Sequence, residues 1–173
     1  MKNILAICGS TRAESSNHRL IHAIKELVAG KLNIDLFESL SLLPHFNPDI
    51  SDEHTPEPVK EFRQQLRNAD GVIICTPEYA HGVPGTLKNA IDWVVGSNEF
   101  SQKPVMLITA STDGRFAHTA LLEILRTIET KETDSLQLLI SFVQTKVSKD
   151  AEITDEKTLE QLKSVMDKLI SVI

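Results

Sequence analysis

The chain reads Gly71-Val72-Ile73-Ile74-Cys75-Thr76, then a loop from Pro77 to Gly85, then Thr86-Leu87-Lys88-Asn89-Ala90-Ile91-Asp92-Trp93. The first run is apolar without alternation, which is typical of a strand that is covered on both faces. The last run places Leu87, Ala90 and Ile91 on one side of a helix. A strand, a loop and a helix in this order predict one unit of a parallel α/β sheet.

Two predicted strands precede this unit. Residues 2–8 form an apolar run that ends at Gly9, and residues 20–28 have the spacing of a helix with one apolar face. Residues 32–37 predict the second strand. The connector that follows contains Pro44, Pro48, Pro56 and Pro58. We expect no regular structure there, because proline fixes φ and lacks a donor N–H.

Two further strands follow the unit. Residues 104–110 predict a strand, residues 111–117 a loop, and residues 136–143 a fifth strand. Helices are predicted after each of the last two strands, the final one amphipathic over residues 159–169. Strands that alternate with helices favour a parallel sheet covered on both faces, because parallel strands require long crossovers. With 173 residues, of which 41% are hydrophobic, the chain is predicted to form a single domain, residues 1–173.

The composition excludes several classes of function. The formal net charge is −6 and no cluster of Lys and Arg stands out, which argues against a nucleic-acid partner. No apolar run approaches the roughly 20 residues that span a bilayer, and the N-terminal run is too short for a signal peptide. The cysteines and histidines lack metal-type spacing, so no metal site is expected. We therefore expect a cytoplasmic protein.

The ligand site is predicted at the carboxyl ends of the strands, where sheets of this kind bind ligands. Three loops should meet there, namely residues 9–17, 77–85 and 111–117. The first loop carries hydroxyls, an amide and a guanidinium immediately before a helix, and the N-terminus of a helix attracts anions. The candidate phosphate ligands are Ser10, Arg12, Ser15, Ser16 and Asn17.

Two observations bear on this phosphate site. Ser15, Ser16 or Asn17 could instead simply cap the helix, since these residue types are the commonest caps. The loop has neither a Gly-x-Gly-x-x-Gly pattern nor a Gly-Lys-Ser/Thr ending. The sequence therefore favours a monophosphate over a pyrophosphate.

Residues 76–93 resemble the NADPH-dependent FMN reductase family, in which a Pro-Glu-Tyr loop leads into a Leu-Lys-Asn-Ala-Ile-Asp-Trp helix. The opening Gly9-Ser10-Thr11-Arg12 and the connector segment Phe46-Asn47-Pro48-Asp49 are similar to that family as well. The resemblance implies a flavodoxin-like, doubly wound, five-stranded parallel sheet with strand order 2-1-3-4-5. It also implies bound FMN, NAD(P)H as co-substrate, and a homodimer or homotetramer.

The same resemblance implies where the flavin binds. The first loop would hold its phosphate, the second loop would lie along its ring, and the third would border the pocket. The residues implied in the second and third loops are Pro77, Glu78, Tyr79, Ala80, His81, Ser111 and Gly114. Many similar proteins have Asn in place of Ala80, so any contact of that amide is missing here. Glu78 is interpreted as bracing the loop, and either Asp113 or Arg115 could face the ring.

The expected function is an FMN-dependent NAD(P)H oxidoreductase without a catalytic protein residue, because the cofactor carries the chemistry. The acceptor would be a small molecule such as a quinone, an azo compound, chromate or free flavin. An alternative is a flavodoxin-type electron carrier, which the low aromatic content of 5% disfavours. A third is a relative that has lost flavin and acts through protein contacts. Cys8 and Cys75 are interpreted as buried thiols rather than a redox pair.

Overall fold

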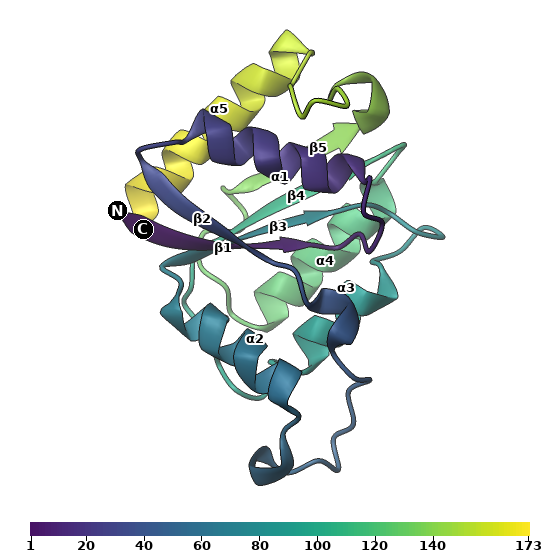
Figure 1. Ribbon diagram of the computed structural model, residues 1–173, viewed down its shortest axis with the longest axis vertical. Coiled ribbons are helices and arrows are strands. Elements are labelled where there is room, and N and C mark those ends of the chain that lie inside the picture. Colours follow the sequence, from purple (N-terminus) through teal and green to yellow (C-terminus); the bar gives the residue numbers. More distant parts are fainter.

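The computed structural model describes residues 1–173, whose five strands form one parallel sheet in the order β2-β1-β3-β4-β5 (Figure 1). The strands are β1 (Lys2–Cys8), β2 (Leu32–Phe37), β3 (Gly71–Thr76), β4 (Val105–Ser111) and β5 (Gln137–Ser141). Every neighbouring pair is parallel. The predicted doubly wound sheet and its strand order are confirmed.

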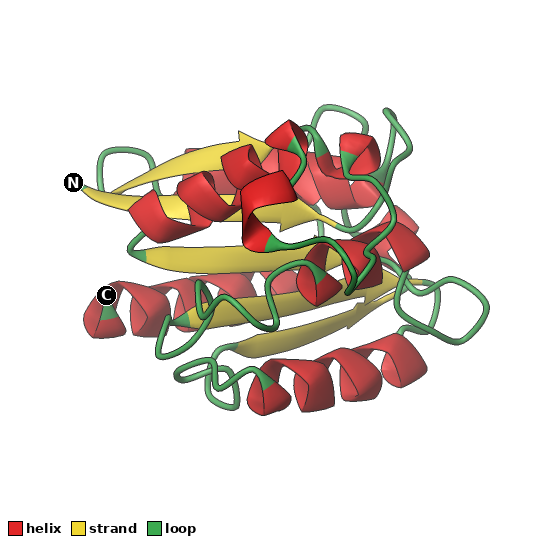
Figure 2. Cartoon of the chain, turned by 90° about the horizontal axis from the view of Figure 1, so that it is seen from below, coloured by secondary structure: helices red, strands yellow, loops and turns green.

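Five α-helices cover the two faces of the sheet, as the layers in Figure 2 show. The helices are α1 (Ser16–Leu27), α2 (Glu57–Asn68), α3 (Gly85–Asp92), α4 (Arg115–Thr127) and α5 (Glu156–Val172). The apolar side chains of α1 and α5 share one core with one face of the sheet. Those of α2, α3 and α4 share a second core with the other face.

Strand β3 lies at the centre of the sheet, and all its residues are buried. Its side chains alternate between the two cores. Ile73 and Cys75 pack on the side of α1 and α5, whereas Val72 and Ile74 pack on the opposite side. Burial on both faces is the reason why this run is apolar without alternation.

Several predicted boundaries are wrong at the carboxyl edge of the sheet. Helix α1 begins at Ser16, so the first loop is shorter than the predicted residues 9–17. Helix α4 already begins at Arg115, so the third loop is shorter than the predicted residues 111–117. Strand β5 ends at Ser141 instead of continuing to residue 143, because Phe142 adopts the left-handed conformation with φ 55°. A short 3₁₀ helix, η3 (Val143–Thr145), follows it.

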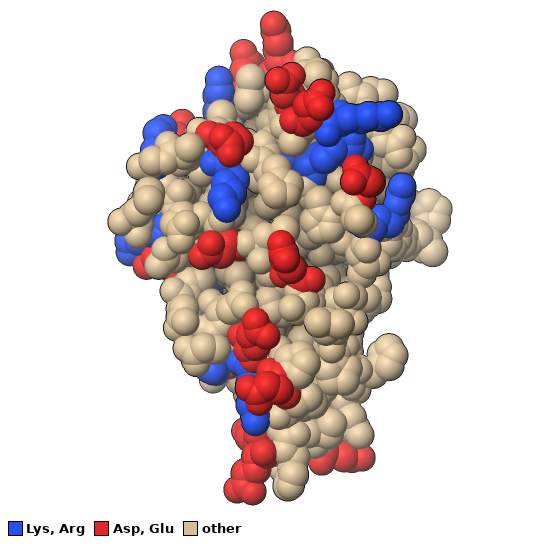
Figure 3. Space-filling view, in the orientation of Figure 1, with Lys and Arg blue, Asp and Glu red and all other residues tan.

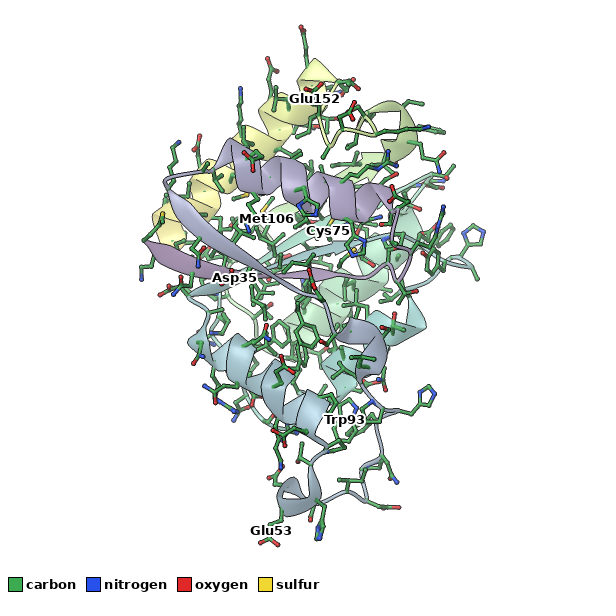
Figure 4. The ribbon with its side chains drawn as sticks, viewed as in Figure 1. Asp35, Glu53, Cys75, Trp93, Met106 and Glu152 are labelled. Carbon is green, nitrogen blue, oxygen red and sulfur yellow. The ribbon has the colours of Figure 1, made fainter.

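The proline-containing connector is more ordered than expected. It contains two 3₁₀ helices, η1 (Leu40–Leu42) and η2 (Asp52–His54), which occupy proline-free stretches. Pro58 lies in the first turn of α2, where its missing N–H would have no intrahelical acceptor, so the expectation of irregular structure is wrong there. Side chains at and after the end of α3 hold the connector in place. Trp93 Nε1 donates to the carbonyl of Pro44 at 2.7 Å, and the Phe46 N–H donates to Asn89 Oδ1 at 2.8 Å. Figure 4 shows Trp93 beside this connector.

The two cysteines are free, buried and opposite each other on β1 and β3. Burial raises the pKa of the Cys8 thiol to about 11 and the pKa of Cys75 well above its ordinary value. Figure 4 shows Cys75 under α1, where its thiol donates to Asn17 Oδ1 at 3.2 Å. Because the thiolate is the reactive form, both cysteines are poor nucleophiles at neutral pH.

Candidate functional site

The carboxyl ends of the strands surround a cleft of about 310 Å³. The predicted residues that line it are Ser10, Arg12, Ser15, Ser16, Asn17, Pro77, Glu78, Tyr79 and Ser111. Ala80, His81 and Gly114 do not line it. The cleft is also bounded by Thr112, which lies in the predicted third loop, and by residues that the sequence did not indicate, namely Ala110, Phe142, Val143, Gln144 and Thr145. Segments distant in the sequence thus form one site.

The first loop is shaped by a close approach to β3. The N–H of Gly9 donates to the carbonyl of Cys75 at 2.8 Å. A Cβ at Gly9 would lie only 2.7 Å from Thr76 Cβ, so glycine is required here for lack of space. The loop then leads to α1, whose N-cap is Ser15. The Ser15 hydroxyl accepts from the N–H groups of Asn17 and His18, so the capping interpretation is correct for this residue.

The Asn17 side chain forms its hydrogen bonds with groups inside the protein. It is buried, its Nδ2 donates to the carbonyl of Ala110 at 3.0 Å, and its Oδ1 accepts from the Cys75 thiol. These bonds fix the start of α1 over β3 and β4. Asn17 therefore positions the loop, and only its second Nδ2 hydrogen is available to a ligand in the cleft.

Arg12 is the one arginine of the chain whose guanidinium makes no hydrogen bond or ion pair within the protein. It lines the same cleft as Ser16, the first residue of α1. The N–H groups in the first turn of a helix lack intrahelical acceptors and attract anions. An unpartnered cation next to such a helix start fits the phosphate group of FMN.

Tyr79 connects the second loop to the first. Its hydroxyl lies 3.2 Å from Ser10 Oγ, while the residue is 45% exposed and lines the cleft. Tyr79 and Gly82 exchange two backbone hydrogen bonds around a turn in which Ala80 and His81 have φ angles of 49° and 56°. This two-residue turn requires positive φ at both positions, which Asn and Gly adopt more readily than Ala.

Glu78 braces the second loop, as the sequence suggested. Its Oε2 accepts from the N–H of Ala117 in the first turn of α4 at 2.9 Å. Its own N–H donates to Ser111 Oγ at 3.2 Å. The carboxylate, only 7% exposed, thus occupies the anion-attracting start of α4 itself. His81 lies at the exposed end of this arrangement, with Nδ1 3.6 Å from Glu78 Oε1.

The third loop turns its charged residues away from the cleft. Arg115 Nε and Nη2 donate to the two carboxylate oxygens of Asp113 at 2.8 and 2.9 Å. These hydrogen bonds lower the pKa of Asp113. Neither residue lines the cleft, so neither faces a ligand there. Gly114 is the N-cap of α4 with φ 93°, a conformation that favours glycine.

A fourth wall of the cleft, residues 142–145, was missed because the apolar run 136–143 was interpreted as a strand to its end. The position of this segment in the chain could have indicated that it belongs to the site. This segment follows a parallel strand, so it had to emerge at the same edge of the sheet as the three predicted loops.

Comparisons with known proteins identify the family of the chain. The family model for NADPH-dependent FMN reductase matches residues 2–145. A 2-hydroxy-1,4-benzoquinone reductase from Burkholderia sp is 30% identical over 171 residues, covering 95% of this chain and 92% of the relative. A quinone reductase from Escherichia coli K12 is 30% identical over 166 residues, covering 92% and 88%.

Solved structures give the same result. The flavoenzyme FerB, an NAD(P)H:(acceptor) oxidoreductase from Paracoccus denitrificans, superposes with a TM-score of 0.81 at 28% identity. The match covers 99% of this chain and 96% of that one. The chain therefore belongs to the NADPH-dependent FMN reductase family and is an FMN-dependent oxidoreductase.

Proposed function

We propose that this protein reduces small quinones with electrons from a nicotinamide nucleotide, using FMN bound in the cleft. The observation that carries the proposal is the unpartnered Arg12 guanidinium at the start of α1, within a cleft that also exposes the ring of Tyr79. This cleft offers one end suited to a phosphate and one suited to a planar ring. Quinones are favoured among the possible acceptors because relatives that match nearly the whole chain are quinone reductases.

In this proposal Arg12, Ser10 and Ser16 hold the phosphate, together with the N–H groups at the start of α1. Ser15 and Asn17 keep that start in position through the bonds described above. The hydride and electron transfer between the nicotinamide and the acceptor would be the chemistry that bound FMN supplies. The protein contributes binding and orientation.

Residues of the second and third loops would form the ring subsite. Pro77 and Tyr79 line it, and Glu78 and Ser111 fix the loop behind them. Ala80, His81 and Gly114, which do not line the cleft, act through the backbone shape that they give these loops.

A flavodoxin-type electron carrier is the second candidate, and one observation favours it. Although aromatic residues are few, both Tyr79 and Phe142 are exposed in the cleft, and flavodoxin-type carriers cover their flavin with aromatic side chains. The low aromatic content of the chain therefore argues less strongly against an electron carrier once the positions of these two rings are known.

An anaerobic titration distinguishes the two. The purified protein, reconstituted with FMN, is mixed with NADPH or NADH and its flavin absorbance is followed, after which benzoquinone is added. We expect rapid bleaching without a long-lived one-electron species, and full reoxidation by one equivalent of quinone. Bound flavin that neither nucleotide reduces would support the carrier and contradict the reductase.

We also propose that the protein is a cytoplasmic homodimer or homotetramer. Leu42, Phe46 and Val95 are exposed apolar side chains in the connector and just after α3. In Figure 3 the flank over α3 shows few charged groups, whereas the lower end of the connector carries acidic side chains. No helix is both long and apolar enough to cross a membrane. Sedimentation equilibrium that gave the mass of a single chain at micromolar concentration would contradict the oligomer.

A further inference from the structure

Phe142 combines two unfavourable features at one position on the rim of the cleft. Its side chain is 64% exposed, although it is a large apolar ring. Its backbone is left-handed, with φ 55°, which a bulky side chain rarely adopts. Residues held in such conformations cluster at ligand sites when the surrounding structure fixes them.

The surrounding structure does fix Phe142. Its N–H donates to the carbonyl of Thr112 at 3.1 Å, and its own carbonyl accepts from both the N–H and the hydroxyl of Thr145, at 3.0 and 2.9 Å. The preceding residue, Ser141, donates from its hydroxyl to the carbonyl of Asp113 at 2.8 Å. The segment after β5 is thus fastened to the third loop, and the ring of Phe142 is presented at the cleft rather than packed into a core.

The ring has no aromatic partner within the protein that would account for this cost. Phe116, which is also exposed, stacks edge-on against His81 with centroids 4.7 Å apart, and Phe46 does the same with Trp93 at 5.3 Å. No comparable aromatic contact involves Phe142. An apolar ring offers nothing to a phosphate, whereas it gains contact and loses hydration against a flat apolar surface.

We propose that residues 142–145 form a fourth wall of the flavin pocket, in which the Phe142 ring packs against the isoalloxazine ring. This inference rests on the proposed function, because it requires that the cleft holds FMN. It assigns a binding role to a segment outside the three loops that the sequence indicated. It also accounts for a left-handed phenylalanine among the residues that line the cleft.

The test is a flavin titration of the full-length protein after its flavin has been removed. Quenching of flavin fluorescence gives the dissociation constants of FMN and of riboflavin, which lacks the phosphate, for wild type, Phe142→Ala and Phe142→Gly. We expect both variants to bind both flavins about tenfold more weakly, the order expected for one lost aromatic contact. Phe142→Gly should also raise the Tm of the flavin-free protein, because glycine adopts φ 55° without strain.

Phe46→Ala is the matched control, since Phe46 is exposed but does not line the cleft. It should leave both dissociation constants unchanged. Unchanged flavin affinity in Phe142→Gly, with a raised Tm, would overturn the inference while leaving the proposed function intact. Weaker binding of FMN but not of riboflavin would overturn it too, because the contact would then be to the phosphate end. A wild-type protein that binds neither flavin would instead overturn the proposed function.

Discussion

Replacing Gly9 with alanine is expected to lower the Tm by about 6 to 12 °C, from roughly 3 kcal/mol of overpacking in a domain of this size. The added Cβ would lie 2.7 Å from Thr76 Cβ and closer still to Thr76 Oγ1. Thr76 is fully buried in the central sheet, and Gly9 itself is held to Cys75 by a backbone hydrogen bond. The strain can be relieved only by moving the loop away from β3.

Gly85→Ala provides the control for this substitution. Gly85 is the first residue of α3, and a Cβ there would meet nothing within 4 Å. Its Tm should stay at or slightly above that of wild type, because alanine favours a helix more than glycine does. Thermal unfolding followed by circular dichroism compares the two. A Gly9→Ala protein as stable as Gly85→Ala would show that the first loop does not cross β3 as closely as described.

The sheet could be predicted from the sequence because the burial of each strand leaves a run of apolar residues in its own segment. The run from Gly71 to Thr76 is apolar on both faces, and so is most of β4 and of β1, because these strands are covered by helices on both sides. The helices carry one apolar face each, which periodicity detects. The strand order came from the resemblance, since spacing alone does not fix which strands are neighbours.

The details of the site depend on contacts that no local pattern records. Strand β5 ends at Ser141 because Ser141 and Phe142 are hydrogen bonded to residues 112 and 113, not because the apolar run ends. Glu78 caps α4 through Ala117, which is 39 positions away in the sequence. Asn17 looked like a phosphate ligand because its type and position suit one, yet Cys75 and Ala110 occupy most of its side chain. Residue type predicted where the site lies better than it predicted what each side chain does.

Arg12→Glu is expected to weaken FMN binding about a hundredfold or more while riboflavin binding stays nearly unchanged. A hydrogen bond to a charged group contributes about 1.5 to 3 kcal/mol, and a carboxylate at this position would in addition repel the phosphate. The effect on folding should be small, because Arg12 is exposed and its guanidinium has no partner to lose. Arg12 is therefore a better probe than Ser10 or Asn17, where an acidic residue would be buried and would disturb the fold itself.

The control for charge is Lys31→Glu, which changes the net charge of the protein by the same amount. Lys31 is exposed and immediately precedes β2, at the end of the sheet opposite the cleft. Fluorescence titrations of both variants with FMN and riboflavin separate a local contact from a general electrostatic effect, which salt would screen. Equal weakening by Lys31→Glu would mean that Arg12 acts only through net charge. Equal loss of FMN and riboflavin in Arg12→Glu would place the phosphate elsewhere, and the cleft would then have to hold the flavin in a different orientation.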